Sequence, residues 1–189
     1  YKIPLVDLVT QHHNLRPKLQ AVLDRFMTDG RFILGPDVEI FEKAFARFCK
    51  ARYCVGTGNG TVSIHAALHA LGIGPGDEVV TVPNTFIATS EAVTQTGARV
   101  VFCDIDPQTH TMDPVSCEKV IAKKTKAIIV VHIHGNPARM DLLKKLANKY
   151  RLFIVEDAAQ AHGAEYKGKR IGNWGDVTTF SFFPAKNLG

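Results

Sequence analysis

The sequence predicts an α/β protein in which a mainly parallel β-sheet is covered by helices on both faces. From residue 53 onward, apolar runs of four or five residues alternate with helical segments. Runs of that length are typical of parallel strands that are buried on both faces. The chain has 189 residues, of which 46% are hydrophobic and 22% are charged. This size and balance suit one globular core.

Two helices are expected ahead of the sheet. The first ends at Gly30, a residue type that often stops helices, and carries apolar residues at helical spacing. These residues are Leu15, Leu19, Val22, Leu23 and Phe26. The second follows Pro36, and we expect its apolar face to belong to the core. That face consists of Val38, Phe41, Phe45 and Phe48. The pattern divides the chain into an N-terminal helical segment, residues 1–35, and a larger domain over residues 36–189.

Strands and helices then alternate along the larger domain. Strands are expected over residues 53–57, 78–82, 100–103, 127–131, 152–155 and 177–182. Helices are expected over residues 61–71, 87–95, 114–123 and 140–150. Residues 164–171, around Lys167-Gly168-Lys169, indicate a small hairpin.

The charge pattern argues against nucleic-acid binding. The net charge of +5 is spread along the chain, and its few basic pairs are typical of solvated helix faces. No apolar run reaches the roughly 18 residues that a membrane span needs. No signal peptide is recognisable, so we expect a cytoplasmic protein. The chain stops three residues after Lys186, within a motif of functional character, which indicates a fragment of a longer protein.

Histidine and cysteine patterns do not predict a metal site. His65 and His69 are spaced for one helix face, but they lack the glutamate of an H-E-x-x-H motif and a third ligand. The four cysteines form no C-x-x-C pair, and we expect buried free thiols.

The turns that follow the strands hold the candidate binding residues, because ligands of open α/β sheets bind beyond the carboxyl ends of the strands. Residues 56–61, GTGNGT, open a helix whose free N–H groups and dipole can hold a phosphate. A tight structural turn is the alternative. A dinucleotide fingerprint is disfavoured because Thr61 stands where the third glycine is needed, and no phosphate-loop motif is present.

Three further positions offer a carboxylate, a ring and an amine. Asp157 follows an apolar strand, where it could bind a protonated ring nitrogen or cap a helix. Phe86 could stack on a planar ring or simply pack. Lys186 lies in an apolar tail, whose poor solvation favours the neutral amine that a Schiff base requires. An exposed turn lysine is the alternative.

Five motifs in this order resemble the DegT/StrS-type nucleotide-sugar aminotransferases, a branch of the fold-type-I enzymes that depend on pyridoxal 5'-phosphate (PLP). The motifs are GRFILGP (30–36), GNGT (58–61), VPNTFIAT (82–89), EDAAQAHG (156–163) and FSFFPAKNLG (180–189). The resemblance implies that residues 36–189 are the PLP-binding large domain, with a C-terminal small domain absent from this chain.

The resemblance also implies roles for seven residues. Gly60, Thr61 and Ser181 would hold the PLP phosphate, Phe86 would stack on the ring, and Asp157 would bind the ring nitrogen. Gln160 would donate to the ring oxygen, and the catalytic Lys186 would form the Schiff base and move protons. One departure is His134, which stands where an aromatic residue is more usual.

The implied reaction transfers an amino group from glutamate to a keto group of a nucleotide-linked sugar, in a homodimer with shared active sites. Two alternatives stay open. A PLP-dependent sugar dehydratase is disfavoured because relatives that dehydrate replace the lysine found here as Lys186. A non-catalytic, regulatory protein on the same scaffold is disfavoured because lysine, carboxylate and phosphate turn are all retained.

Overall fold

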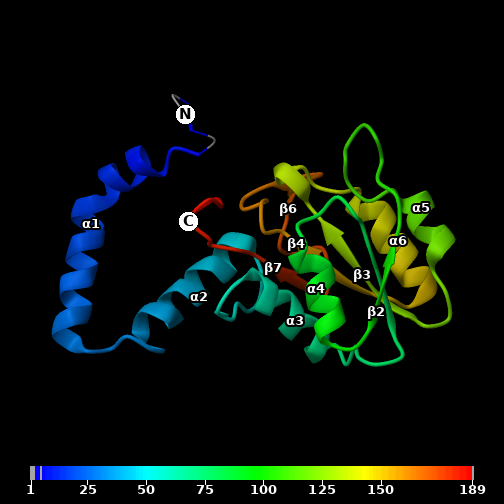
Figure 1. Cartoon of the computed structure of the whole chain (residues 1–189), viewed down its shortest axis with the longest axis horizontal. Coiled ribbons are helices and arrows are strands. Elements are labelled where there is room, and N and C mark those ends of the chain that lie inside the picture. The colour runs from blue at the N-terminus through cyan, green and yellow to red at the C-terminus, as the bar shows by residue number, and fades with distance from the viewer. Residues whose placement is uncertain (1–2, 5, 189) are drawn as a thin grey trace.

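The computed structural model describes residues 3–4 and 6–188, so Tyr1 and Gly189 lie outside it. Its centre is a five-stranded sheet in the order β2-β1-β3-β4-β7, in which every neighbouring pair is parallel (Figure 1). The strands are β1 (Glu78–Thr81), β2 (Arg99–Phe102), β3 (Thr125–Val131), β4 (Phe153–Asp157) and β7 (Val177–Thr179). The predicted fold class is confirmed.

Alternate side chains of the central strand β3 enter two separate cores. Ile128 and Val130 pack in one cluster with residues of α6, whereas Ala127 and Ile129 pack in the other with residues of α3 and α4. The helices involved are α3 (Gly60–Ala70), α4 (Ala88–Gln95), α5 (Pro114–Val120) and α6 (Met140–Tyr150). Because successive side chains point to opposite faces of a strand, the apolar run over residues 127–131 of β3 requires helices on both sides.

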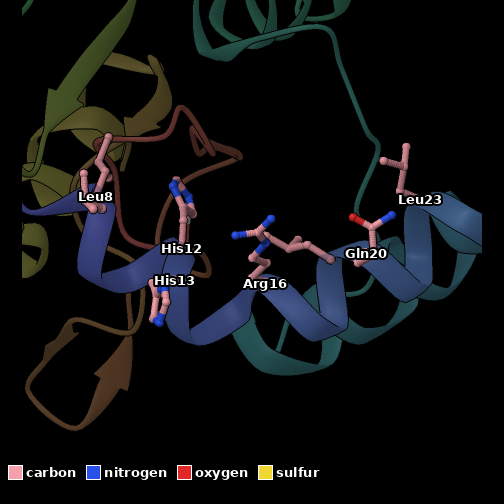
Figure 2. A pocket seen from close by; sticks show the side chains of 8 residues that line it. Leu8, His12, His13, Arg16, Gln20 and Leu23 are labelled. Carbon is pink, nitrogen blue, oxygen red and sulfur yellow. The ribbon is translucent and has the colours of Figure 1, made fainter.

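The helix α1 (Leu8–Asp29) stands apart from the sheet and contains no buried residue (Figure 1). Gly30 ends it in the left-handed conformation (φ 66°), as predicted. A groove runs along α1 (Figure 2) and is lined by Leu8, Val9, His12, His13, Arg16, Leu19, Gln20 and Leu23. Of the described helices, none combines the length and apolar character that crossing a membrane requires.

The helix α2 (Pro36–Cys49) joins α1 to the sheet domain (Figure 1). Its Phe45 is buried at 7% exposure, but Phe41 and Phe48 remain 40% and 38% exposed. The prediction of core phenylalanines is therefore confirmed for Phe45 and wrong for the other two.

The strand predicted over residues 53–57 is the main error. This segment forms no ladder among the described residues, and Tyr53 and Val55 are 73% and 78% exposed. Its Gly56 N–H donates instead to the Glu42 carboxylate on α2, 2.6 Å away. An apolar run alone does not make a strand, because a strand also needs a neighbour with which its backbone groups can pair.

Smaller differences concern the ends of elements. The helix α5 ends at Val120 rather than at residue 123, because Ile121 turns to an extended backbone conformation. The strand β4 continues to Asp157, and β7 ends at Thr179. The predicted hairpin is confirmed as β5 (Glu165–Tyr166) and β6 (Lys169–Arg170), which pair in antiparallel orientation.

The cysteines are free thiols, as predicted. Cys49, Cys103 and Cys117 are buried, and Cys54 is partly buried. Burial, reinforced by the neighbouring Cys54, raises the pKa of the Cys49 thiol to about 11. A thiol with a raised pKa is a poor nucleophile near neutral pH, which supports a packing role.

Candidate functional site

Contacts between distant segments bring the predicted residues to the carboxyl edge of the sheet. Gly60 lies against Ser181 of the segment after β7. Asp157, at the end of β4, accepts a hydrogen bond from Thr89 of α4. Gln160 is bonded to the backbone of His134, which follows β3. These contacts join candidate residues and their neighbours across up to about 120 positions of sequence.

The start of α3 forms an anion cradle. The Asn59 side chain accepts from the Val62 N–H (2.9 Å) and thereby caps the helix. Among the described residues, no hydrogen bond uses the N–H groups of Gly60 or Thr61. A Cβ atom at position 60 would lie 3.2 Å from Ser181 Cβ and 3.5 Å from its Oγ. A phosphate could therefore accept hydrogen bonds from two free N–H groups and the Ser181 hydroxyl, and the dipole of α3 would favour its negative charge.

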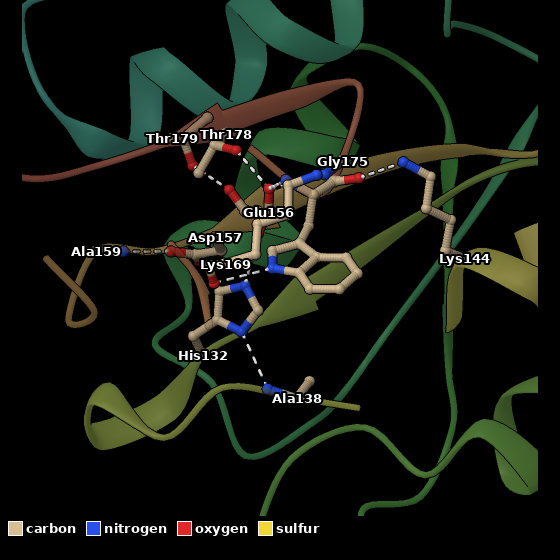
Figure 3. Close-up of polar contacts among 11 residues, drawn as sticks. His132, Ala138, Lys144, Glu156, Asp157, Ala159, Lys169, Gly175, Thr178 and Thr179 are labelled. Carbon is tan, nitrogen blue, oxygen red and sulfur yellow. Dashed lines mark hydrogen bonds and ion pairs between the residues drawn. The ribbon is translucent and has the colours of Figure 1, made fainter. Parts of the chain in front are cut away.

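The Asp157 carboxylate is 6% exposed and held on both oxygens. Its Oδ1 accepts from the Ala159 N–H at 3.2 Å (Figure 3), and its Oδ2 accepts from the Thr89 hydroxyl at 2.7 Å. The alternative that Asp157 caps a helix is wrong, because residues 158–163 form turns rather than a helix. A buried carboxylate at this edge is well suited to bind a cationic partner.

The Gln160 amide has a fixed orientation. Its Oε1 accepts from the His134 N–H at 2.7 Å, so the amide nitrogen points its two hydrogens elsewhere. Within the described part of the chain, no hydrogen bond uses that nitrogen. It can therefore donate to a ligand oxygen. His134 contributes through its backbone, which is left-handed (φ 55°), while its side chain is exposed.

Within the described part of the chain, no hydrogen bond joins the side chains of Phe86 and Lys186 to the other candidate residues. Phe86 is 70% exposed, which argues against a role in packing within this chain. Lys186 is partly buried, and its N–H donates to the Phe183 carbonyl at 2.7 Å. Both side chains are accessible to a ligand.

His162 is a neighbour of Lys186 that the sequence analysis left without a role. Its ring lies 5.1 Å from the ring of Phe180 and 5.2 Å from that of Phe182. Burial lowers the pKa of its imidazole, and the positive charge of Lys186 acts in the same direction. A lowered pKa favours the neutral imidazole, which packs in the aromatic cluster without adding a second positive charge near Lys186.

Directly beneath the edge, Glu156 organises a buried network (Figure 3). Its side chain is completely buried, and its Oε1 accepts three hydrogen bonds. The donors are the Trp174 N–H at 3.0 Å, the Gly175 N–H at 2.8 Å and the Thr178 hydroxyl at 2.6 Å. Its Oε2 lies 3.1 Å from His132 Nε2. The carboxylate thus joins β3, β4 and the segment that leads into β7.

The tautomer of His132 follows from its two contacts. Its Nδ1 accepts from the Ala138 N–H at 3.1 Å, so this nitrogen carries no proton. The proton therefore sits on Nε2 and is donated to Glu156. Burial opposes ionisation of Glu156, but the bonds from His132, Gly175 and Thr178 outweigh it and lower the pKa of the carboxyl.

With this geometry established, the chain can be compared with known proteins. Residues 14–189 match the model of the DegT/DnrJ/EryC1/StrS aminotransferase family. The chain belongs to this family. The membership confirms the resemblance carried by the five motifs.

Individual DegT/StrS relatives are similar along nearly the whole chain. The chain is 45% identical to the dTDP-3-amino-3,4,6-trideoxy-alpha-D-glucose transaminase of Streptomyces venezuelae, with 100% of this chain and 50% of the relative aligned. It is 46% identical to a protein of Geobacillus stearothermophilus named "Pleiotropic regulatory protein", with 99% and 50% aligned. The chain therefore spans about half the length of the relatives it matches.

Solved structures of the family share the fold described above. The structure of DesV from S. venezuelae superposes with a TM-score of 0.96 at 45% identity, over 99% of this chain and 50% of that one. The structure of NtdA from Bacillus subtilis, solved with bound cofactor PMP, gives a TM-score of 0.93 at 36% identity, over 99% and 42%. The DegT/StrS fold of this chain is therefore well established.

The close approach of Gly175 to β4 leads to a first prediction. A Cβ atom at this position would lie 2.7 Å from the Ile154 carbonyl oxygen and 3.2 Å from Glu156 Cγ. Since backbone must move to relieve such a clash, we expect Gly175→Ala to reduce the free energy of unfolding by about 1–3 kcal/mol. Urea denaturation of the complete protein measures this change. Gly58→Ala is the control, because no atom lies within 4 Å of its added Cβ. Equal stability of the two variants would contradict the prediction.

Proposed function

We propose that the complete protein is a PLP-dependent aminotransferase that transfers an amino group from glutamate to a keto group of a nucleotide-linked sugar. The observation that carries the proposal is the assembly, at one edge of the sheet, of the anion cradle and the buried Asp157 carboxylate. The family relationship and the names of the transaminase relatives support it. PMP, bound in NtdA, is the amino form of PLP.

The residues present fit PLP. The free N–H groups of Gly60 and Thr61, with the Ser181 hydroxyl, suit its phosphate. Asp157 suits a protonated ring nitrogen, and the free amide nitrogen of Gln160 suits the ring oxygen. When bound, PLP supplies an electron sink for the carbon that loses its proton.

Different residues of the chain would hold the cofactor and move the proton. The cradle and Asp157 fix the two ends of the cofactor ring, and the exposed ring of Phe86 covers one face. Lys186 would hold the cofactor at its aldehyde carbon and, when released as a free amine, would accept and return the proton of the substrate carbon. His162 shields the lysine from water on the side of the aromatic cluster.

Three further features belong to the proposal. We propose a homodimer with shared active sites, which the exposed apolar residues Phe32 and Ile33 support. We also propose a cytoplasmic location. The division into a helical segment, 1–35, and a PLP-binding large domain, 36–189, is supported by the absence of buried residues in α1.

The test is product formation by the complete protein. Incubation with glutamate and a set of nucleotide-linked ketosugars is expected to yield an aminosugar and 2-oxoglutarate, both measured by mass spectrometry. Release of a dehydrated sugar instead would favour the dehydratase alternative. A protein that binds no PLP and forms neither product would support a regulatory role, as in the name of the G. stearothermophilus relative.

A further inference from the structure

We propose that Thr89, supported by Thr85, is a positioning residue that sets the orientation of the Asp157 carboxylate toward the cofactor ring nitrogen. The inference rests on the proposed PLP-dependent function. Neither threonine is among the residues proposed above to contact the cofactor.

The contact between Thr89 and Asp157 joins two elements that are 68 positions apart. Thr89 is fully buried on the first turn of α4, and its Oγ1 lies 2.7 Å from Asp157 Oδ2. An ionised carboxylate only accepts hydrogen bonds, so the threonine hydroxyl is the donor. The Ala159 N–H donates to the other oxygen, Oδ1. Bonds on both oxygens prevent the carboxylate from rotating and leave its remaining lone pairs in fixed directions.

Thr85 extends this contact by one more hydroxyl. Its Oγ1 lies 2.9 Å from Thr89 Oγ1. The single hydrogen of the Thr89 hydroxyl is already donated to Asp157, so Thr85 must be the donor in the second bond. The result is a directed chain from Thr85 through Thr89 to Asp157. Such a chain polarises the terminal donor and strengthens its bond to the carboxylate.

The same threonine also fixes the turn that carries Phe86. The backbone N–H of Thr89 donates to the Phe86 carbonyl at 3.2 Å. Thr89 therefore links the backbone of the residue proposed to stack on the ring to the carboxylate proposed to bind the ring nitrogen. One buried residue therefore contacts both segments, Phe86 through its backbone N–H and Asp157 through its hydroxyl.

The experiment compares two ligands that differ at one atom. The complete apoprotein is titrated with PLP and with a deaza analogue in which carbon replaces the ring nitrogen. Thr89→Val removes the hydroxyl but keeps the shape of the side chain, and Thr89→Ser restores the hydroxyl. We expect Thr89→Val to weaken binding of PLP roughly tenfold and to leave binding of the analogue unchanged. Thr89→Ser is expected to bind PLP like the wild type, and Thr85→Val to show a smaller loss that also depends on the ring nitrogen.

The outcomes separate this inference from the proposed function. Equal weakening of both ligands, or no weakening, would overturn the positioning role while leaving PLP binding intact. A wild-type protein that binds neither ligand would overturn the proposed function, and the inference with it. Thermal unfolding of each apoprotein identifies a variant that fails to fold. If Thr89→Val fails to fold, the test rests on Thr85→Val. An equal loss of affinity for PLP and for the deaza analogue in that variant would overturn the inference.

Discussion

Replacing Glu156 by alanine is expected to remove most of the stability of the protein. The substitution leaves four donors without their acceptor: the buried His132 ring, and the partly buried N–H groups of Trp174 and Gly175 and hydroxyl of Thr178. Each unsatisfied buried group costs about 1–3 kcal/mol. At about 1 kcal/mol for each donor, the total loss is about 4 kcal/mol, a large part of the roughly 5–15 kcal/mol by which a typical domain is stable.

The measurement is urea denaturation of the apoprotein, followed by circular dichroism. Glu39→Ala is the matched control, because the only contact that its side chain makes with the described residues is an exposed ion pair with Lys43 on α2. The loss of this pair should cost less than about 1 kcal/mol. Glu156→Gln keeps an oxygen for three of the donors and should fall between the two. Similar midpoints for Glu156→Ala and Glu39→Ala would contradict the network as a source of stability.

The same network makes part of the stability depend on pH. Burial opposes ionisation of Glu156, but hydrogen bonds, led by the one from His132, lower the pKa of its carboxyl in the folded state. Its contribution is therefore present above the pKa of the unfolded chain, about 4, and is lost as the pH falls through the folded value. The stability difference between wild type and Glu156→Gln should shrink at acid pH. A difference in unfolding free energy that stays constant with pH would contradict a lowered pKa of Glu156 as its source.

The location of the site could be predicted because parallel strands end at a common edge. Asp157 ends β4, Ser181 follows β7 and Gly60 begins α3. In the structure Gly60 lies against Ser181, and β4 pairs with β7 at Asp157. The rule needs only the order of the elements and not their packing. The sequence could therefore indicate a candidate site at this edge although the strand predicted over residues 53–57 was wrong.

The supporting residues could not be predicted, because their roles depend on tertiary contacts. Thr89 lies in the first turn of a helix, where a threonine usually serves local backbone contacts, and nothing in the sequence links it to Asp157. Glu156 and Asp157 are adjacent, so their side chains leave β4 on opposite faces. Only the packed sheet reveals that one faces the network around His132 while the other faces Thr89.

The largest effect on activity is expected for Lys186. The Lys186→Ala variant of the complete protein should lose aminosugar formation by at least roughly a thousandfold, because it loses both the amine that binds the cofactor aldehyde and the group that moves the proton. The variant should also lose the visible absorption band that this covalent attachment produces. Activity and absorption spectra, recorded on the same samples, measure both effects.

Controls distinguish the amine of Lys186 from its charge. Lys186→Arg keeps a positive charge but offers no nucleophilic amine, so it should be as inactive as Lys186→Ala. Lys43→Ala removes an exposed lysine of α2 that is paired with Glu39 and should leave activity and spectrum unchanged. The Lys186→Ala variant keeps the residues proposed to contact the phosphate, the ring nitrogen and the ring oxygen of PLP. It should therefore still bind PLP, but more weakly and without the absorption band. A variant that keeps both band and turnover would exclude Lys186 as the residue that binds the aldehyde.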